Sequence, residues 1–266
     1  MICHKTRVVA AAGAGDRQEP VVLAAVRRGW PGTAGTLRLL HCYLRWVDRA
    51  RLIDEHPILF HMAQDGTWPS IQEHGLLSTT ALVDLYDPSP ADRAAILQSR
   101  RRAGFVLDDP ALGRAAVRDQ KPLQRLDRLA LGTTLQEFLD LLNGRVFFWL
   151  TRARLDTLLG AKAYRDHPQL VLCFDTAELL ERHAARVQLS PYNSGSMARA
   201  NSPVRGRDLF RDIDDYPYDS WRKERRSRTN AVVELTVDHA VPDAARLAVR
   251  VERWQGGHCT GVLHQR

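Results

Sequence analysis

Short apolar runs separated by polar turns recur along the chain and predict strands that alternate with short helices. The predicted strands, rich in β-branched, leucine or aromatic residues, lie at 58–62, 145–150, 170–174, 231–242 and 246–253. Helices with apolar residues on one face are predicted between them, at 68–74, 135–142 and 177–185. The spacing is too irregular for a doubly wound dinucleotide fold, and no GxGxxG or GxxxxGK[ST] motif occurs. The sequence therefore predicts an α+β fold, with a compact sheet packed by small helices.

The beginning of the chain differs in composition from the rest. It contains an alanine- and glycine-rich stretch, and only Thr36–Ile53 places apolar residues at helical spacing. A chain of 266 residues is long enough to bury a sizeable core. We therefore predict an N-terminal extension over 1–53, partly disordered with one helix, and a domain over 54–266.

The chain is basic, with a formal net charge of +7 and a pI near 9.6. One basic run, Arg222–Arg228, lies within a long polar segment at 190–230 that also contains tyrosines. A loop of this length inside a compact domain is usually functional or disordered. Its arginines and aromatic rings suit phosphate contacts and base stacking, which makes it a candidate nucleic-acid contact. A solvated charged surface is the simpler alternative.

Cysteine spacing and hydropathy restrict the setting of the protein. The four cysteines lie far apart without a CxxC pair, so neither a metal site nor a disulfide framework is predicted, and a reducing cytoplasm is the simplest location. The sequence has no apolar run long enough to span a bilayer and no signal-peptide pattern near its start, so no membrane association is predicted.

One carboxylate interrupts the apolar strand predicted at 231–242. Glu234 follows Val232 and Val233 and precedes Leu235. Burial of an ionised carboxylate costs several kcal/mol unless it has partners, so Glu234 either lies at a solvated edge of the sheet or lines a cleft. A second candidate is His61, which closes the first predicted strand and is either structural or part of the same cleft.

Several motifs carry a resemblance to known families. Residues from about 55 to the end resemble an uncharacterised bacterial domain family of unknown function, through the segments Phe60-His61-Met62-Ala63, Trp68-Pro69-Ser70-Ile71, His74-Gly75-Leu76-Leu77-Ser78, Arg118-Asp119-Gln120-Lys121-Pro122 and Arg145–Leu150. The same segments more distantly resemble the DarT group of DNA ADP-ribosyltransferases. In that group the catalytic glutamate lies in a strand with the spacing Glu-x-x-Val-x-x-x-Val-Pro, which this chain matches with Glu234, Val237, Val241 and Pro242. The chain departs from the DarT pattern after the histidine and in a long insertion before the aromatic strand.

The resemblance implies an ADP-ribosyltransferase-like compact split β-sheet that binds NAD as a substrate. It implies that Glu234 stabilises positive charge on the ribose, that His61 holds the adenosine ribose and that Phe148 stacks on nicotinamide, a phenylalanine where the poly-ADP-ribose polymerases keep tyrosine. An arginine is expected to pair with the pyrophosphate or the target. The expected catalytic residues are Glu234 and Arg100, and the expected cofactor-binding residues are His61, Met62, Ser78, Phe148, Trp149 and Arg118.

Three functional hypotheses follow. The leading one is an NAD-dependent ADP-ribosyltransferase that modifies a nucleic-acid base or another large acceptor through the segment 190–230, with a partner protein that neutralises it as an antitoxin would. The second is an NAD glycohydrolase, in which water is the acceptor. The third is a nucleic-acid or protein binding module that keeps the fold without the chemistry, which salt-sensitive binding would indicate.

Overall fold

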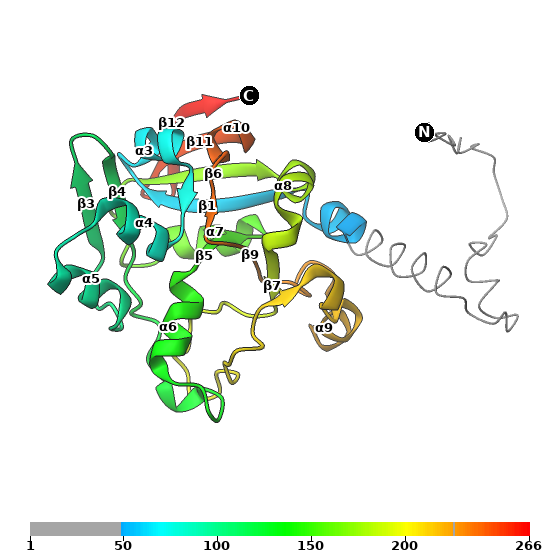
Figure 1. The fold of residues 1–266 in the computed structure, drawn as a ribbon. Coiled ribbons are helices and arrows are strands. Elements are labelled where there is room, and N and C mark those ends of the chain that lie inside the picture. Colours follow the sequence, from blue (N-terminus) through cyan, green and yellow to red (C-terminus); the bar gives the residue numbers. More distant parts are fainter. Residues whose placement is uncertain (1–48, 226) are drawn as a thin grey trace, which may run out of the picture. The chain divides into compact units, whose positions relative to one another are not determined.

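The computed structural model describes residues 49–225 and 227–266, and an antiparallel sheet of eight strands forms its centre (Figure 1). The strands are β1 (Ile58–Gln64), β5 (Arg145–Trp149), β6 (Gln169–Asp175), β7 (Val187–Ser190), β8 (Arg211–Asp212), β9 (Glu234–Asp238), β11 (Ala248–Gln255) and β12 (His258–Gln265). Their order across the sheet is β12-β11-β6-β1-β5-β9-β7-β8. Sequence neighbours are therefore often separated in space, and β9 lies beside β5.

The remaining elements surround this sheet. Two smaller ladders join β2 (Leu76–Leu77) to β10 (Ala240–Val241) and β3 (Phe105–Asp109) to β4 (Gly113–Val117). The helices are α3 (Trp68–His74), α4 (Thr79–Tyr86), α5 (Pro90–Leu97), α6 (Leu135–Asn143), α7 (Arg152–Leu159), α8 (Thr176–His183), α9 (Tyr218–Arg225) and α10 (Ala244–Leu247), with 3-10 turns η1 (Leu126–Arg128), η2 (Ala184–Arg186) and η3 (Ile213–Asp215). The predicted mixture of helices and strands is confirmed.

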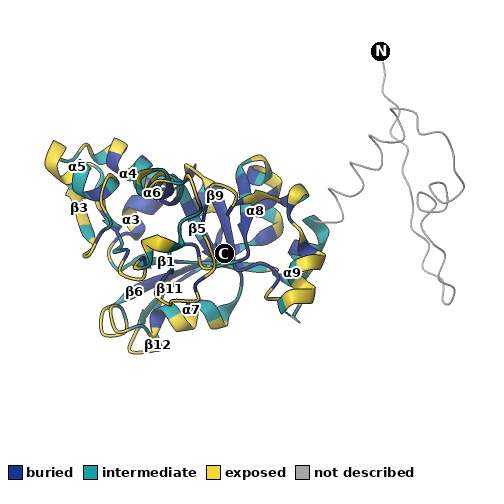
Figure 2. Cartoon of the chain, turned by 90° about the horizontal axis from the view of Figure 1, so that it is seen from below, coloured by how far each residue is buried: buried dark blue, intermediate teal, exposed yellow. Residues whose placement is uncertain are grey.

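Both faces of the sheet are covered. In β6, Leu170, Leu172 and Phe174 belong to the core on one face, and Val171 and Cys173 belong to the core on the other. Successive side chains of a strand point to opposite faces, so a strand covered on both sides has a continuous apolar sequence. Figure 2 shows that burial is concentrated in such central strands, whereas α5 and α9 carry many exposed residues.

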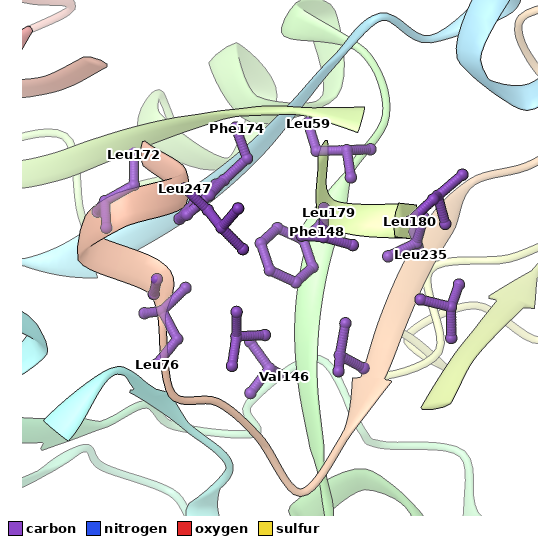
Figure 3. Packing of buried hydrophobic residues seen from close by; sticks show 14 of the residues in the cluster. Leu59, Leu76, Val146, Phe148, Leu172, Phe174, Leu179, Leu180, Leu235 and Leu247 are labelled. Atoms are coloured by element: carbon purple, nitrogen blue, oxygen red, sulfur yellow. The ribbon is translucent and has the colours of Figure 1, made fainter. Parts of the chain in front are cut away.

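The larger core surrounds Phe148 of β5 (Figure 3). The ring of Phe148 is fully buried and packs edge-on against Phe174, with ring centroids 5.3 Å apart. Burial of a phenylalanine side chain stabilises a fold by about 1.5–3 kcal/mol. Leu179 and Leu180 of α8 pack in this core, while Leu155 of α7 packs on the opposite face of the sheet.

The sheet opens between β1 and β5. These strands share the single residue pair Phe60 and Trp149, whereas β1 pairs with β6 along its full length. Beyond that pair, backbone groups on the facing edges need partners other than a neighbouring strand, because an unpaired buried carbonyl is costly. The sheet is thus split at its centre, and the split creates space for polar side chains.

Two regions differ from their predictions. The segment 190–230, predicted as a long loop, contains β8, η3 and α9, and its Phe210, Ile213 and Tyr216 are buried. These apolar residues recur every third position, but over only seven positions among mostly charged residues, and so short a run does not predict an element. The single strand predicted at 231–242 is instead two strands, β9 and β10, which are separated at His239, where φ is 63°.

The start of the described region packs on the domain. Residues 49–55 are helical, and Leu52 is fully buried in the same core as Leu59. The packed region therefore includes residues that precede the predicted boundary at 54. The rest of the extension, including most of the helix predicted at 36–53, lies outside the described residues.

Gly75 joins α3 to β2 and is expected to tolerate no side chain. Its φ is 79°, and a Cβ atom there would lie 2.4 Å from the carbonyl oxygen of Val241 and 2.5 Å from Cα of Pro242. We expect Gly75→Ala to lower the free energy of unfolding by about 2–5 kcal/mol, through left-handed strain and backbone overlap together. Urea denaturation measures this loss.

Gly132→Ala is the matched control for this change. Gly132 has a φ of 78°, and nothing lies within 4 Å of the added Cβ. The free energy of unfolding of Gly132→Ala should fall by only about 1–2 kcal/mol, from left-handed strain alone. Equal losses for the two variants would show that the contact with β10 does not constrain Gly75.

Candidate functional site

A cavity of about 310 Å³ lies at the split in the sheet. Its walls come from β1, β4, β5, α3 and the turn at 193–195, so segments far apart in the sequence meet there (the strands are labelled in Figure 1). Pockets for small molecules usually measure about 300–1,000 Å³. The cavity therefore has room for part of a nucleotide-sized ligand.

His61 lies on the β1 side of the split and lines the cavity. Its Nδ1 donates to the carbonyl oxygen of Phe147, 2.8 Å away, because a carbonyl can only accept. Burial lowers the pKa of His61 to about 4; the bond to Phe147 opposes this shift, and the charge of Arg118 adds to it. The imidazole is therefore neutral at pH 7, and its Nε2 is a hydrogen-bond acceptor. A ligand hydroxyl group is a suitable donor to it.

Glu234 begins β9 and lines the same cavity, with a side chain only 4% exposed. Its Oε2 accepts a hydrogen bond from the backbone N–H of Ser194 at 3.0 Å. Burial raises the pKa of Glu234 to about 7, although the bonds from Ser194 and the charges of Arg205 and Arg154 lower it. The sequence allows Glu234 either at a solvated edge of the sheet or in a cleft, and in the structure it lies in the cleft.

Two arginines complete one wall of the cavity. Arg118 Nη2 donates to the Met62 carbonyl at 2.5 Å and thereby satisfies a backbone acceptor on the open edge of β1. Arg101 is 7% exposed, and its guanidinium donates to the Ile96 carbonyl, to Asn143 Oδ1 and to the Arg118 carbonyl. Burial lowers the pKa of both arginines, that of Arg101 to about 10.

The cavity wall carries more cationic than anionic side chains. Arg101 and Arg118 form no ion pair with a carboxylate in residues 49–225 and 227–266, and both remain cationic at neutral pH because arginine gives up its proton only at high pH. The charged residues that line the cavity are Arg101, Arg114, Arg118, Arg145, Asp119 and Glu234. An anionic ligand would compensate the excess positive charge.

The prediction for Phe148 is corrected by the alternation of β5. Phe148 points into the apolar core with Leu235 as its neighbour on β9, and it does not line the cavity. Its ring centroid lies 5.8 Å from that of His61, so it supports the imidazole from the core side. The adjacent rings of Phe147 and Trp149 border the cavity instead. The prediction for Trp149 agrees with this placement, as does that for Met62, which also lines the cavity.

The structure also places Arg100 and Ser78 away from the cavity. Arg100 Nη1 donates to the Leu123 carbonyl, and its neighbour Arg101 is the residue that reaches the cavity wall. The preceding helix α5 ends at Leu97, so helical periodicity does not determine whether Arg100 or Arg101 points toward the cavity. The buried hydroxyl of Ser78 caps α4 by accepting from the Ala81 amide.

Three contributors to the site were missed by the sequence prediction: Arg101, Phe147 and Ser194. Phe147 could have been found by counting positions along β5 from a known core residue, because side chains alternate. Arg101 and Ser194 depend on how loops fold over the sheet, and no periodic signal marks them. Gly75 lines the cavity and lies against Val241 and Pro242, so the segment His74–Ser78 meets the end of the Glu234–Pro242 motif there.

In the described part of the chain, no three histidine, cysteine or acidic side chains lie close enough to bind a metal ion. No helix there is long and apolar enough to cross a bilayer.

The strands that form this cavity lie within a region that matches one family of proteins. Curated proteins give no match. The model of the family of unknown function DUF7002 matches residues 57–248, which is more than half of the chain and includes β1, β5 and β9. The chain therefore belongs to the DUF7002 family.

Proposed function

We propose that the protein is an NAD-dependent ADP-ribosyltransferase that modifies a nucleic-acid base or another macromolecular acceptor. The observation that supports this best is that Glu234, a buried carboxylate, and His61, a neutral imidazole, line one cavity at the split in the sheet. The distant resemblance of the surrounding motifs to the DarT group favours the same chemistry. The cytoplasm is the proposed location, and Cys173 and Cys259 are free thiols, as is usual there.

The reaction breaks one bond and forms another at the same carbon. The bond between ribose C1′ and the nicotinamide nitrogen breaks, and the electron pair leaves with nicotinamide. The acceptor atom bonds to C1′, and its proton passes to a base. Positive charge develops on the ribose during this exchange, and an ionised Glu234 would stabilise it and then accept the acceptor's proton.

The other cavity residues fit the parts of NAD. The Nε2 of His61 can accept a hydrogen bond from a ribose hydroxyl, because Nδ1 holds the proton. The ring of Trp149 offers a surface for a planar base, in the role first assigned to Phe148. Arg101 and Arg118 can donate to the diphosphate, which is the recognition chemistry that guanidinium groups favour.

The acceptor is proposed to approach past the segment 190–230. Its Asn193 and Gly195 line the cavity next to Ser194, and the helix α9 of the same segment exposes Arg222 and Lys223. Exposed cations on the segment that contributes the 193–195 turn to the cavity favour a polyanionic acceptor such as a nucleic acid. A neutralising partner protein would have to cover the same segment.

The test is incubation of the purified protein with NAD labelled on the adenylate, in the presence of single-stranded DNA, RNA or protein. We expect nicotinamide release together with label on one of these macromolecules. Release with free ADP-ribose alone would indicate a glycohydrolase. An absence of release and of any NAD-dependent rise in melting temperature would contradict both enzyme proposals, and salt-sensitive binding of nucleic acid would then indicate a binding module.

A further inference from the structure

Arg205 is a buried cation outside the cavity whose side chain holds a turn. It is 2% exposed and lies in the segment between β7 and β8. Its backbone N–H donates to the Arg128 carbonyl, and its carbonyl accepts from the Ala130 N–H. Its Nη1 donates to the Pro203 carbonyl at 2.9 Å, and its Nη2 lies 3.3 Å from the Asn193 carbonyl and 3.5 Å from the Ser196 carbonyl. Its guanidinium also stacks over the ring of Tyr192, 4.3 Å from the centroid. One side chain thus fixes the turn 192–196 from several directions.

That turn carries the hydrogen bond that orients the carboxylate of the site. Ser194 lies between the two carbonyl groups that Arg205 Nη2 approaches, and its N–H donates to Glu234 Oε2 at 3.0 Å. Ser194 is 1% exposed, so water does not replace this bond without a change in the turn. A shift of the turn would therefore move the donor away from Glu234.

The charge of Arg205 acts on Glu234 as well. Arg205 and Arg154 of α7 both favour the ionised form of Glu234, and Arg225 of α9 lies close enough to both arginines to lower the pKa of each. The other ionisable groups at the cavity are His61, which is neutral, and the cavity-wall residues Arg101, Arg114, Arg118, Arg145 and Asp119. Arg205 makes no ion pair with a carboxylate in the described residues, and the charge of Glu234 opposes the lowering of its pKa by burial.

We propose that Arg205 is a positioning residue for Glu234, which it serves by holding the Ser194 amide against the carboxylate and by supplying a compensating positive charge. This inference rests on the proposed function in treating Glu234 as the group that acts on the ligand. Arg205 itself does not line the cavity and touches no substrate. Its effect should therefore appear in kcat and in the titration of Glu234, with little change in KM.

The test compares Arg205→Met, Arg205→Lys and the control Arg207→Met. Methionine keeps much of the side-chain volume and removes the charge and all donors. Lysine keeps the charge, but an ammonium group cannot reproduce the planar contacts with several carbonyls. Arg207 lies in the same segment, is largely exposed and pairs with Glu137 at the surface, so its loss should change neither measurement.

Two measurements are made on each variant: the pH profile of nicotinamide release, and the pKa of Glu234 from carboxyl ¹³C resonances. We expect Arg205→Met to raise the pKa of Glu234 by about one unit and to lower kcat about tenfold at pH 7. Arg205→Lys keeps the charge but not the contacts with the turn, so it should raise the pKa of Glu234 by less than Arg205→Met does and still lower kcat by about threefold to tenfold.

The outcomes separate the inference from the proposed function. A folded Arg205→Met protein with a wild-type Glu234 pKa would overturn the inference, because a purely structural arginine changes the melting temperature alone. If Arg205→Met does not fold, wild-type kcat in Arg205→Lys would overturn it. A wild-type protein without turnover, in which Arg205→Met still raises the Glu234 pKa, would refute the proposed function and support the positioning role.

Discussion

Replacement of Glu234 by glutamine should reduce nicotinamide release from NAD by about 10³-fold or more. Glu234 is the buried one of the two carboxylates that line the cavity, and glutamine keeps its shape without the charge. Loss of an electrostatic group aimed at developing charge costs about 10²–10³ in rate, and loss of a general base costs a similar factor. Single-turnover measurement of nicotinamide at saturating NAD reports this loss directly.

Glu252→Gln is the matched control for this experiment. Glu252 is also a buried glutamate, 8% exposed, but it lies on β11 and bonds to Arg250 and Trp254 outside the cavity. The Glu252→Gln variant should retain nicotinamide release even if its free energy of unfolding falls. Turnover by Glu234→Gln within about tenfold of the wild type would exclude Glu234 from the mechanism, since no acid–base or electrostatic role is that small.

Local sequence signals predicted most of the elements around the site. The helix 68–74 has the predicted bounds, and the strands at 58–62, 145–150 and 170–174 correspond to β1, β5 and β6. These predictions succeed because periodicity and turn residues act within a few positions of the chain.

The direction of a side chain was harder to predict than the element that carries it. The family resemblance implied an aromatic residue of β5 in the same site as Glu234. Phe147, Phe148 and Trp149 are adjacent aromatics, however, and only strand pairing decides which of them faces the cavity. The register pairs Trp149 with Glu234 and Phe148 with Leu235. A shift of the strand register by one residue moves every side chain to the opposite face of the sheet, so composition alone cannot show which aromatic residue faces the cavity.

Contacts made by irregular segments could not be predicted from local sequence signals. At the split between β1 and β5, His61 and Arg118 donate to the backbone carbonyls of Phe147 and Met62, and these two donors are 57 positions apart in the sequence. The Ser194 amide reaches Glu234 only because Arg205 holds its turn. Such contacts lie in irregular segments, where no hydrophobic period relates sequence position to direction.

The buried state of Glu234 should also make the stability of the protein depend on pH. Its pKa is about 7 in the folded protein, compared with 4.5 for an ordinary glutamate, and burial is the main cause. The folded state therefore retains a proton that the unfolded chain releases between these two values. Because the unfolded chain binds fewer protons in this window, the contribution of Glu234 to stability falls as pH rises from about 4.5 to about 7 and stays constant above it.

Glu234→Gln removes this penalty, so the variant should be more stable than the wild type at pH 8.5, by about 3 kcal/mol for a pKa raised by about 2.5 units. For a domain of this size that corresponds to a melting temperature higher by roughly 6–12 °C. At pH 4 the two proteins should differ by less than about 1 kcal/mol, since both side chains are then neutral. Urea denaturation across pH 4–8.5 measures both quantities, and the comparison cancels the titration of all shared groups. A constant difference between the two proteins over the whole range would mean that Glu234 titrates as in the unfolded chain, and its carboxylate could then not be held in a desolvated cavity.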